Sequence, residues 1–483
     1  MMLSAVALVA AVSGCRTNKD ILNDYEKATL IGDYEGPVAE IEEKAEDGGV
    51  DELMWRLHAG CSRYLLNNRS EAIAQFDLAE DVFLRNDATS VFSQGSDVAF
   101  AMVTNDRVFP YSGGGEDRIF ACFYKAVDYA SGGSLDAAQT ELNRAAQHQD
   151  NWLWERKKEI ADAAEKMTED AAAYARSDSA AISADSIAKS RQTVKSAFSD
   201  ANFSGMVKSQ CGFDIACDGN VETLARKDWL NRYVQYVTGV FRWLNGEADA
   251  ANYLREIAAL DPANALVKAD LAAAETGGRP ANQVWVFVED GLCPAREEWR
   301  IDLPTVLIPY LNRYILYAGM ALPYLRYRDA ASTSYTLSAD GNSTAFVEIQ
   351  DFDRLLKTEF DVYFRNALIR EITRTVVKVG MQVALGVVAE NTDDDYTKIA
   401  LQASQAAAAV WAASVTQADL RSWTGLPKKA YAMRVERPAS GKLTLSGDGA
   451  PVAEVELPPG NSMVFVRRPS RGAAAVVKTV LFK

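Results

Sequence analysis

The sequence is short of the side chain that enzymes use most often to move protons. It contains only two histidines, His58 and His148, among 483 residues, and this leaves few acid–base schemes open. It also lacks the nucleophile elbow, the zinc-protease helix, the phosphate loop and the dinucleotide fingerprint. We therefore expect a protein that is not an enzyme and has no cofactor and no metal. A carboxylate-based hydrolase is a minor alternative, since two acidic groups suffice for such chemistry.

Basic residues are fewer than acidic residues. The chain has 51 Lys and Arg against 66 Asp and Glu, a formal net charge of −15. Nucleic acids are bound through clustered cations that neutralise phosphates, and anionic lipid headgroups attract basic segments in the same way. The charge balance therefore argues against both of these partners and favours basic or neutral ones.

An uninterrupted apolar run long enough to span a bilayer is missing at the start of the chain. Residues 1–14 are uncharged, but the run ends at Arg16, short of the roughly 20 residues a spanning helix needs. We interpret residues 1–14 as an export signal, although no Lys or Arg precedes the apolar core. The stretch Val12-Ser13-Gly14-Cys15 resembles the lipobox of bacterial lipoproteins. The resemblance implies a lipid on Cys15, a tether at 15–19 that joins the protein to the bilayer, and, from Arg16, an outer-membrane location facing the periplasm.

Cysteines are few as well. Five remain besides Cys15, so they cannot all pair within the chain. Cys211 and Cys217 flank a turn-rich stretch, which favours a short-range disulfide in an oxidising compartment. A zinc site lacks histidine ligands. Cys61 and Cys122 lie on apolar helical faces and are expected to be small buried hydrophobes.

Three stretches of the chain share the layout of a helix pair with small residues where the helices meet. We interpret residues 20–277 as a tetratricopeptide-like array of α-α repeats, in which large apolar side chains fill the gap to the next pair. The three stretches run from Leu53 to Phe83, from Phe120 to Gln147 and from Tyr233 to Pro262.

The composition changes after a Gly-Gly-Arg-Pro cluster, so residues 278–283 are predicted to be a linker. Residues 284–483 are expected to form a mixed α/β domain. It would contain a strand at 284–288, a hairpin over 335–349, and two long antiparallel helices over 353–390 and 397–422. Terminal β-strands are expected from about residue 430. The predicted fold class is therefore α+β, mostly α.

Several segments of the chain resemble a family of uncharacterised tetratricopeptide-like lipoproteins found chiefly in Gram-negative bacteria. The most specific is Asp419-Leu420-Arg421-Ser422-Trp423 followed by Leu426-Pro427. The others are 229–262, VWVFVEDGLCPAREEWRIDLP at 284–304, FRNALIREITRTVVK at 364–378, the remainder of 418–438, and GNSMVFVRRP at 460–469. The resemblance implies an exported lipoprotein of helical repeats plus a mixed domain, with no established activity.

Two clusters are candidates for a binding surface. One is Asp419, Arg421 and Trp423, because Arg and Trp are enriched in interface hot spots. The alternative is a Trp that fills the core and an Asp–Arg pair that orders a turn. The other cluster is Arg370, Arg374 and Lys378, which recur every four residues and would align on one helix face, either to meet an anionic partner or as a solvated face.

These observations favour a membrane-anchored, non-enzymatic scaffold that binds an envelope protein or peptide segment. The alternative is an accessory factor for cell-wall synthesis whose C-terminal domain contacts glycan, with peptidoglycan as a partner. In that case the repeats would serve as a spacer.

Overall fold

The computed structural model describes residues 17–90, 105–174, 184–302 and 315–482. It confirms the α+β class, with helices gathered in the N-terminal half and sheets in the C-terminal half. Cys15, the predicted lipidation site, lies outside the described residues, as do the predicted signal at 1–14 and the first residues of the tether.

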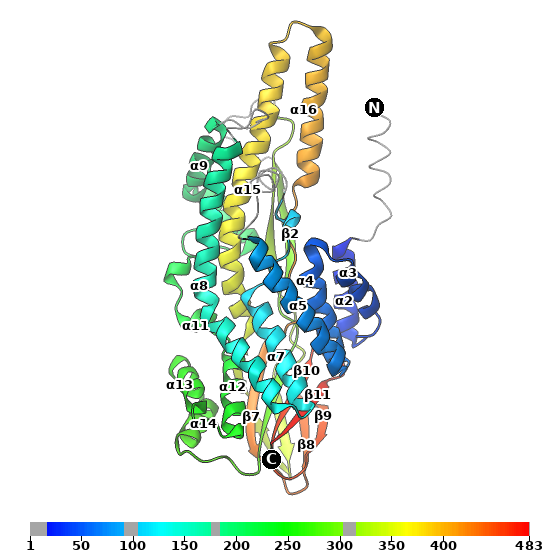
Figure 1. Ribbon diagram of the computed structural model, residues 1–483, viewed down its shortest axis with the longest axis vertical. Helices are drawn as coiled ribbons and strands as arrows, with labels where there is room; N and C mark the ends of the chain where they lie inside the picture. The colour runs from blue at the N-terminus through cyan, green and yellow to red at the C-terminus, as the bar shows by residue number, and fades with distance from the viewer. Residues whose placement is uncertain (1–16, 91–104, 175–183, 303–314, 483) are drawn as a thin grey trace.

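The described residues of the N-terminal half are mostly α-helical (Figure 1). In chain order the helices are α2 Asn18–Ile31, α3 Val38–Glu46, α4 Glu52–Leu65, α5 Arg69–Ser90, α7 Gly115–Ser131, α8 Leu135–Tyr174, α9 Ala184–Ser199, α10 Ala201–Cys211, α11 Arg226–Trp229, α12 Arg232–Asn245, α13 Ala250–Leu260 and α14 Ala265–Glu275, with 3-10 turns at Gly49–Asp51, Asp106–Val108 and Val221–Thr223.

Small residues set the spacing within the helix pairs. Gly60 of α4 faces Phe76 of α5, and a Cβ on Gly60 would lie 2.6 Å from the Phe76 ring. Gly239 of α12 likewise faces Leu254 of α13, at 2.9 Å from where its Cβ would be. The absence of a side chain therefore lets each pair of helices approach closely.

The described residues of the C-terminal half form three sheets. Its strands are β1 Gln283–Asp290, β2 Ala295–Asp302, β3 Gly319–Arg326, β4 Tyr335–Ala339, β5 Asn342–Ala345, β6 Val347–Asp351, β7 Lys429–Glu436, β8 Lys442–Gly447, β9 Ala450–Glu456, β10 Asn461–Arg468 and β11 Val476–Phe482. The largest sheet has the order β11-β10-β1-β7-β6, in which β1 pairs with β10 in parallel. The others are the ribbon β2-β3 and the sheet β5-β4-β8-β9.

The predicted hairpin over 335–349 is divided between two sheets. Residues 342–345 pair with β4 across the turn at Asp340 and Gly341, both of which have positive φ. Residues 347–351 instead join the large sheet by pairing with β7. The chain therefore passes from the sheet of β4 to the large sheet between residues 345 and 347, shortly before α15 begins at Phe352.

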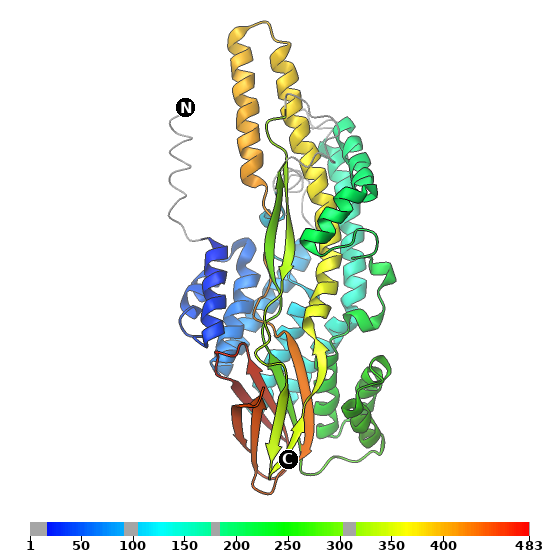
Figure 2. The same cartoon turned by 180° about the vertical axis from the view of Figure 1, so that it is seen from behind.

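Helices α15 Phe352–Glu390 and α16 Asp395–Val415 lie side by side, and their distal part stands beyond the rest of the described chain in both views (Figures 1 and 2). The second helix was predicted to reach residue 422 but ends at Val415. Thr416 leaves the helix, and its hydroxyl donates to the Ala412 carbonyl and accepts from Lys378.

The two halves share one hydrophobic core. Phe123 of α7 lies 6.2 Å from Phe465 of β10, measured between ring centroids, and Phe465 stacks on Phe287 of β1 at 5.2 Å. Tyr233 of α12 meets the same Phe287. The boundary predicted at 278–283 therefore separates helices from strands, but it does not separate two independent cores.

Candidate functional site

The structure has a cleft where three helix ends meet the last strand. It has a volume of about 430 Å³ and opens to solvent. Pockets of this size accommodate a small ligand or the side chains of a short peptide segment. It is lined by Ala130, Ser131, Gly133, Leu135, Leu244, Asn245, Arg279, Thr479, Leu481 and Phe482, which belong to α7, α8, α12, β11 and the segment before β1.

Strand β11 gives the cleft its most distinctive wall. It is an edge strand of the large sheet, paired with β10 on one side. An edge strand presents backbone N–H and C=O groups to an incoming strand. Phe482 is buried against Phe241 of α12, whereas Leu481 is 47% exposed at the cleft.

One cation lies at the rim of the cleft. Arg279 is exposed, and its guanidinium donates to the backbone carbonyl of Asn245 at the end of α12. Apolar walls with a single charged group are typical of sites that orient one end of a ligand.

The predicted cluster of Asp419, Arg421 and Trp423 lies in the interior, away from this cleft. Trp423 is buried between Phe76 and Tyr124. Arg421 forms ion pairs with Asp419 at 2.7 Å and Asp51 at 3.1 Å. The guanidinium also donates to the backbone carbonyls of Val50, Asp106 and Phe109. The cluster therefore joins the two halves of the protein, and the prediction that it forms a binding surface is wrong.

The predicted cation stripe is also internal. Arg370 pairs with Asp106 at 2.7 Å, and Arg374 pairs with both Asp106 and Glu371. Burial alone would raise the pKa of Asp106, but the two arginines together hold it well below its usual range. Lys378 is buried, which lowers the pKa of its ammonium to about 8. Arg370 and Arg374 thus hold α15 to the 3-10 turn at 106–108, and Lys378 donates to Thr416 just after α16. Neither a partner-binding face nor a solvated face describes this stripe.

The predicted disulfide is not formed. Cys211 and Cys217 are free thiols. Cys211 is buried in a small core of α9, α10, α15 and β3, whereas Cys217 is exposed and donates to the Asp218 carboxylate. The two side chains lie on opposite sides of the turn, one inward and one outward. Cys61 and Cys122 are buried, as predicted.

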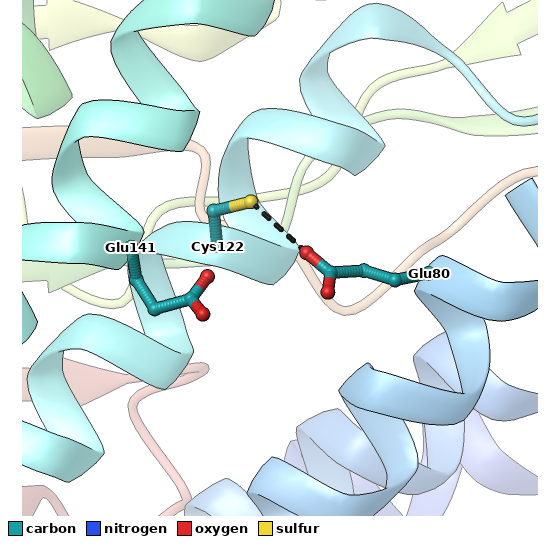
Figure 3. A group of neighbouring side chains, drawn as sticks. All are labelled: Glu80, Cys122 and Glu141. Carbon is teal, nitrogen blue, oxygen red and sulfur yellow. Dashed lines mark hydrogen bonds between the residues drawn. The ribbon is translucent and has the colours of Figure 1, made fainter. Parts of the chain in front are cut away.

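Three side chains with metal-binding atoms gather between α5, α7 and α8 (Figure 3), namely Glu80, Cys122 and Glu141. A cation is already present, because the buried ammonium of Lys125 lies 2.9 Å from Glu80 and 3.1 Å from Glu141. Burial, followed by the two carboxylates, raises the pKa of the Cys122 thiol well above its usual value. The thiol therefore stays protonated and donates to Glu80. The two carboxylates are balanced by Lys125 together with Arg144, whose guanidinium lies 2.8 Å from Glu80 and 3.1 Å from Glu141.

A second acidic pair lies at the start of α7. Glu359 of α15 accepts from the backbone N–H groups of Gly115 and Glu116, so it caps the helix N-terminus. Burial and the neighbouring Glu359 raise the pKa of Glu116 well above its usual range. Glu116 accepts from Asn231. These carboxylates serve helix capping and packing, and the cleft contains none of them.

Sequence reasoning missed a buried polar layer. It is formed by residues of the segments 284–304 and 460–469, two of those that resemble the lipoprotein family. Glu289 of β1 is 2% exposed and accepts the hydroxyls of Tyr124 at 3.0 Å and Tyr233 at 2.9 Å. Arg467 of β10 lies beside it in register, 3.7 Å away. The paired charges at the ends of two apolar strands were the available signal, although their parallel pairing is not visible in the sequence. The cleft residues carried no such signal.

No protein-family model, curated protein or solved structure matches the chain.

Proposed function

We propose that this chain is a non-enzymatic, lipid-anchored scaffold of the bacterial cell envelope that binds an extended protein segment in the cleft beside β11. The observation that carries the proposal is the cleft itself. It combines an edge strand, walls that are mostly apolar but include Ser131, Asn245 and Thr479, and one exposed cation in a single place.

An extended segment matches this combination. A peptide that adds to an edge strand gains main-chain hydrogen bonds, and alternate side chains enter the neighbouring pocket. Here Leu135, Leu244 and Leu481 offer apolar contacts to those side chains. Arg279 favours a segment with one carboxylate at the matching position.

The helix pairs support the role of scaffold. The pairs α4–α5 and α12–α13 meet at Gly60 and Gly239, and α7–α8 follows the same up-and-down course. We interpret them as tetratricopeptide-like units, which form rigid surfaces for protein segments. The cleft lies at the ends of α7 and α12, where such an array meets the sheet.

A lipid on Cys15 is the proposed anchor. The chain is acidic overall, so attachment through the acyl chains does not depend on attraction to anionic headgroups. The outer membrane, with the protein facing the periplasm, remains the proposed location.

The placement of the ionisable groups supports a role without catalysis. The buried carboxylates and cations named above are held in ion pairs, helix caps and tyrosine hydrogen bonds. The cleft is lined by Arg279 as its one ionisable side chain among the described residues. Acid–base chemistry needs groups that reach a substrate, and the carboxylates described here do not line the cleft.

An accessory role in cell-wall synthesis is a second candidate function. The exposed Arg279 at the rim of the cleft favours it, because the peptide stems of peptidoglycan carry carboxylates that such a guanidinium would bind.

A displayed library of 12-residue peptides, selected on the full chain carrying Cys15→Ser, tests the proposal. We expect extended apolar peptides whose affinity falls at least tenfold in the variant Leu481→Arg. The matched control is Leu84→Arg on α5, because Leu84 is also an exposed leucine, 65% exposed against 47%, and does not line the cleft. Peptides that bind both variants equally, or no recovered peptide at all, would contradict the proposal.

A further inference from the structure

The distal part of the α15–α16 hairpin exposes an unusual amount of apolar surface. Neither Val379 to Ala389 on α15 nor Ile399 to Val415 on α16 contains a charged residue. The exposed large apolar side chains of this region are Val387 at 39%, Val388 at 52%, Tyr396 at 87%, Ile399 at 65% and Val410 at 71%.

Helix α16 has two apolar faces. Gln405, Ala409 and Ala412 are buried on the side that packs against α15. The outer side carries a second stripe at helical spacing of three and four residues, namely Tyr396, Ile399, Ala403, Ala406 and Val410, all exposed. A helix that is apolar on opposite faces is normally covered on both.

A bilayer does not suit this hairpin. Among the described residues, α15 alone has the length and hydropathy of a membrane-spanning helix, and half of that stretch is buried inside the protein. Its uncharged exposed part, Val379 to Ala389, is eleven residues. Eleven residues rise about 17 Å, little more than half of the ~30 Å hydrocarbon layer. The preceding Lys378 and Arg374 are fixed in the body by Thr416 and Asp106.

The charges of the hairpin are divided between its two ends. The turn at the tip carries Glu390, Asp393, Asp394 and Asp395, and Lys398 follows in the first turn of α16, so the tip is acidic overall. At the base of α16, Arg300 donates to the Ala413 carbonyl at 2.8 Å, and Arg107 donates to the Gln417 amide oxygen at 2.9 Å. One end of the hairpin is thus acidic, and the other is flanked by two cations.

The acidic tip of one hairpin is complementary in charge to the cationic base of a second copy. Two hairpins packed antiparallel would place the acidic tip of each beside Arg300 and Arg107 of the other, with the apolar stripes of α16 between them. A parallel arrangement would bring two acidic tips together, and like charges oppose that pairing. A two-fold antiparallel arrangement needs one surface only, repeated on both copies.

We propose that the partner of the α15–α16 hairpin is a second copy of this chain, and that the two hairpins pack antiparallel through the outer stripes of α16. The stripe is about 31 Å long and one helix, about 10 Å, wide, so each copy contributes roughly 300 Å². The total of about 600 Å² is the size of a weak, concentration-dependent interface. This pairing leaves the cleft open, because α12 and β11, which line it, lie at the opposite end of the molecule from the tip of the hairpin (Figures 1 and 2).

The mass of the full chain carrying Cys15→Ser, measured by sedimentation equilibrium across a concentration series, tests the pairing. We expect a mass that rises with concentration toward twice that of one chain, and one chain mass in the variant Ile399→Lys. Leu84→Lys is the matched control, because Leu84 has the same exposed fraction of 65% on another helix; it should remain a dimer. A monomer for the parent chain, or a dimer that survives Ile399→Lys, would overturn the proposal.

The orientation is tested by cross-linking in a background that lacks the exposed Cys217 through Cys217→Ser. We expect chains carrying Asp393→Cys to form disulfides with chains carrying Gln417→Cys, and neither variant to cross-link alone. Disulfides within the Asp393→Cys population alone would show a parallel pair and overturn the antiparallel assignment. The charge swap Asp393→Arg should weaken the dimer at least tenfold, and the added Arg300→Asp should restore it.

A membrane as the true occupant has a distinct outcome. If the Cys15→Ser chain floats with vesicles of phosphatidylethanolamine and phosphatidylglycerol, and Ile399→Lys abolishes flotation, the hairpin binds lipid and the proposal is wrong. We expect the chain to stay in the aqueous fraction. Peptide binding at β11 is measured separately, so either proposal can fail without the other.

Discussion

His58 is held as a neutral imidazole in the core. Its Nδ1 lies 2.8 Å from the Met54 carbonyl and therefore donates to it, which leaves Nε2 to accept from the Thr424 backbone N–H at 3.3 Å. Burial lowers the pKa of His58 to about 4. Protonation would put a second donor where Nε2 now accepts, so the folded state resists it.

This arrangement predicts an acid-sensitive contribution to stability. The folded pKa lies below the unfolded value of 6.5, so the contribution is complete above pH 6.5 and is lost as the pH falls toward 4. The loss amounts to about 3 kcal/mol. Urea unfolding at pH 7 and pH 4 should show that the stability advantage of the parent over His58→Asn shrinks by this amount.

The comparison with the variant is necessary because other groups titrate nearby. Burial raises the pKa values of Asp117 and Asp128 to about 6. Their contributions have the opposite sign, since they are complete at low pH and are lost as the pH rises through about 6. An advantage over His58→Asn that does not change with pH would show that His58 does not titrate in this window.

Arg421 contributes more to stability than any surface ion pair should. Its guanidinium has two carboxylate partners and three backbone carbonyls in a buried site. Arg421→Met would leave Asp419 and Asp51 without their cation, at a cost of about 3 to 5 kcal/mol. Thermal and urea unfolding measure this cost.

The control is Arg471→Met. Arg471 pairs with Asp448 but is 73% exposed, so its loss should cost less than about 1 kcal/mol. Equal costs for the two substitutions would show that the contacts of Arg421 do not join the halves as described.

At the scale of elements, the close approach of the helices predicts opposite effects on stability for two glycine-to-alanine substitutions. Gly60→Ala would push a methyl group to within 2.6 Å of the Phe76 ring and should destabilise the protein by about 1 to 3 kcal/mol. Gly205→Ala, inside α10, meets nothing within 4 Å. It should be neutral or stabilise by up to about 1 kcal/mol. Urea unfolding of both variants would contradict the account if the two effects were alike.

The periodicity of the sequence predicted where helices and strands lie better than it predicted which strands pair with one another. The apolar run at 284–288 corresponds to β1, and the terminal strands expected from about residue 430 correspond to β7 to β11. The ribbon of β2 and β3 was missed because β2 is rich in charged side chains and β3 carries Pro323 within the strand, and neither feature is typical of a strand interior. The parallel pairing of β1 with β10 joins residues more than 170 positions apart, and no local pattern encodes that choice.

The candidate site was less predictable than the fold. Arg370, Arg374 and Arg421 read as surface cations because a sequence shows charge but not burial, and their partner Asp106 is more than 260 positions away. Leu481 and Arg279 are unremarkable alone, and only the packing of β11 beside α7 and α12 makes them neighbours. Local patterns therefore located the helices, whereas the cleft required the tertiary structure.

At the scale of the whole molecule, the shared core predicts that neither half folds alone. Residues 20–277 would expose Phe123 and Tyr233, and residues 281–483 would expose Phe287 and Phe465. Each fragment should show far-UV circular dichroism without cooperative unfolding, and co-expression should restore one transition. A cooperatively folded fragment with the stability of the full chain would contradict a single core.

Hydrogen exchange of the full Cys15→Ser chain, with and without a selected 12-residue peptide, tests the central claim most directly. A peptide that extends the large sheet should protect backbone amides of β11, while amides at the tip of α16 exchange at unchanged rates. Protection confined to residues remote from β11, or binding without any change in its exchange, would contradict the assignment of this cleft as the binding site.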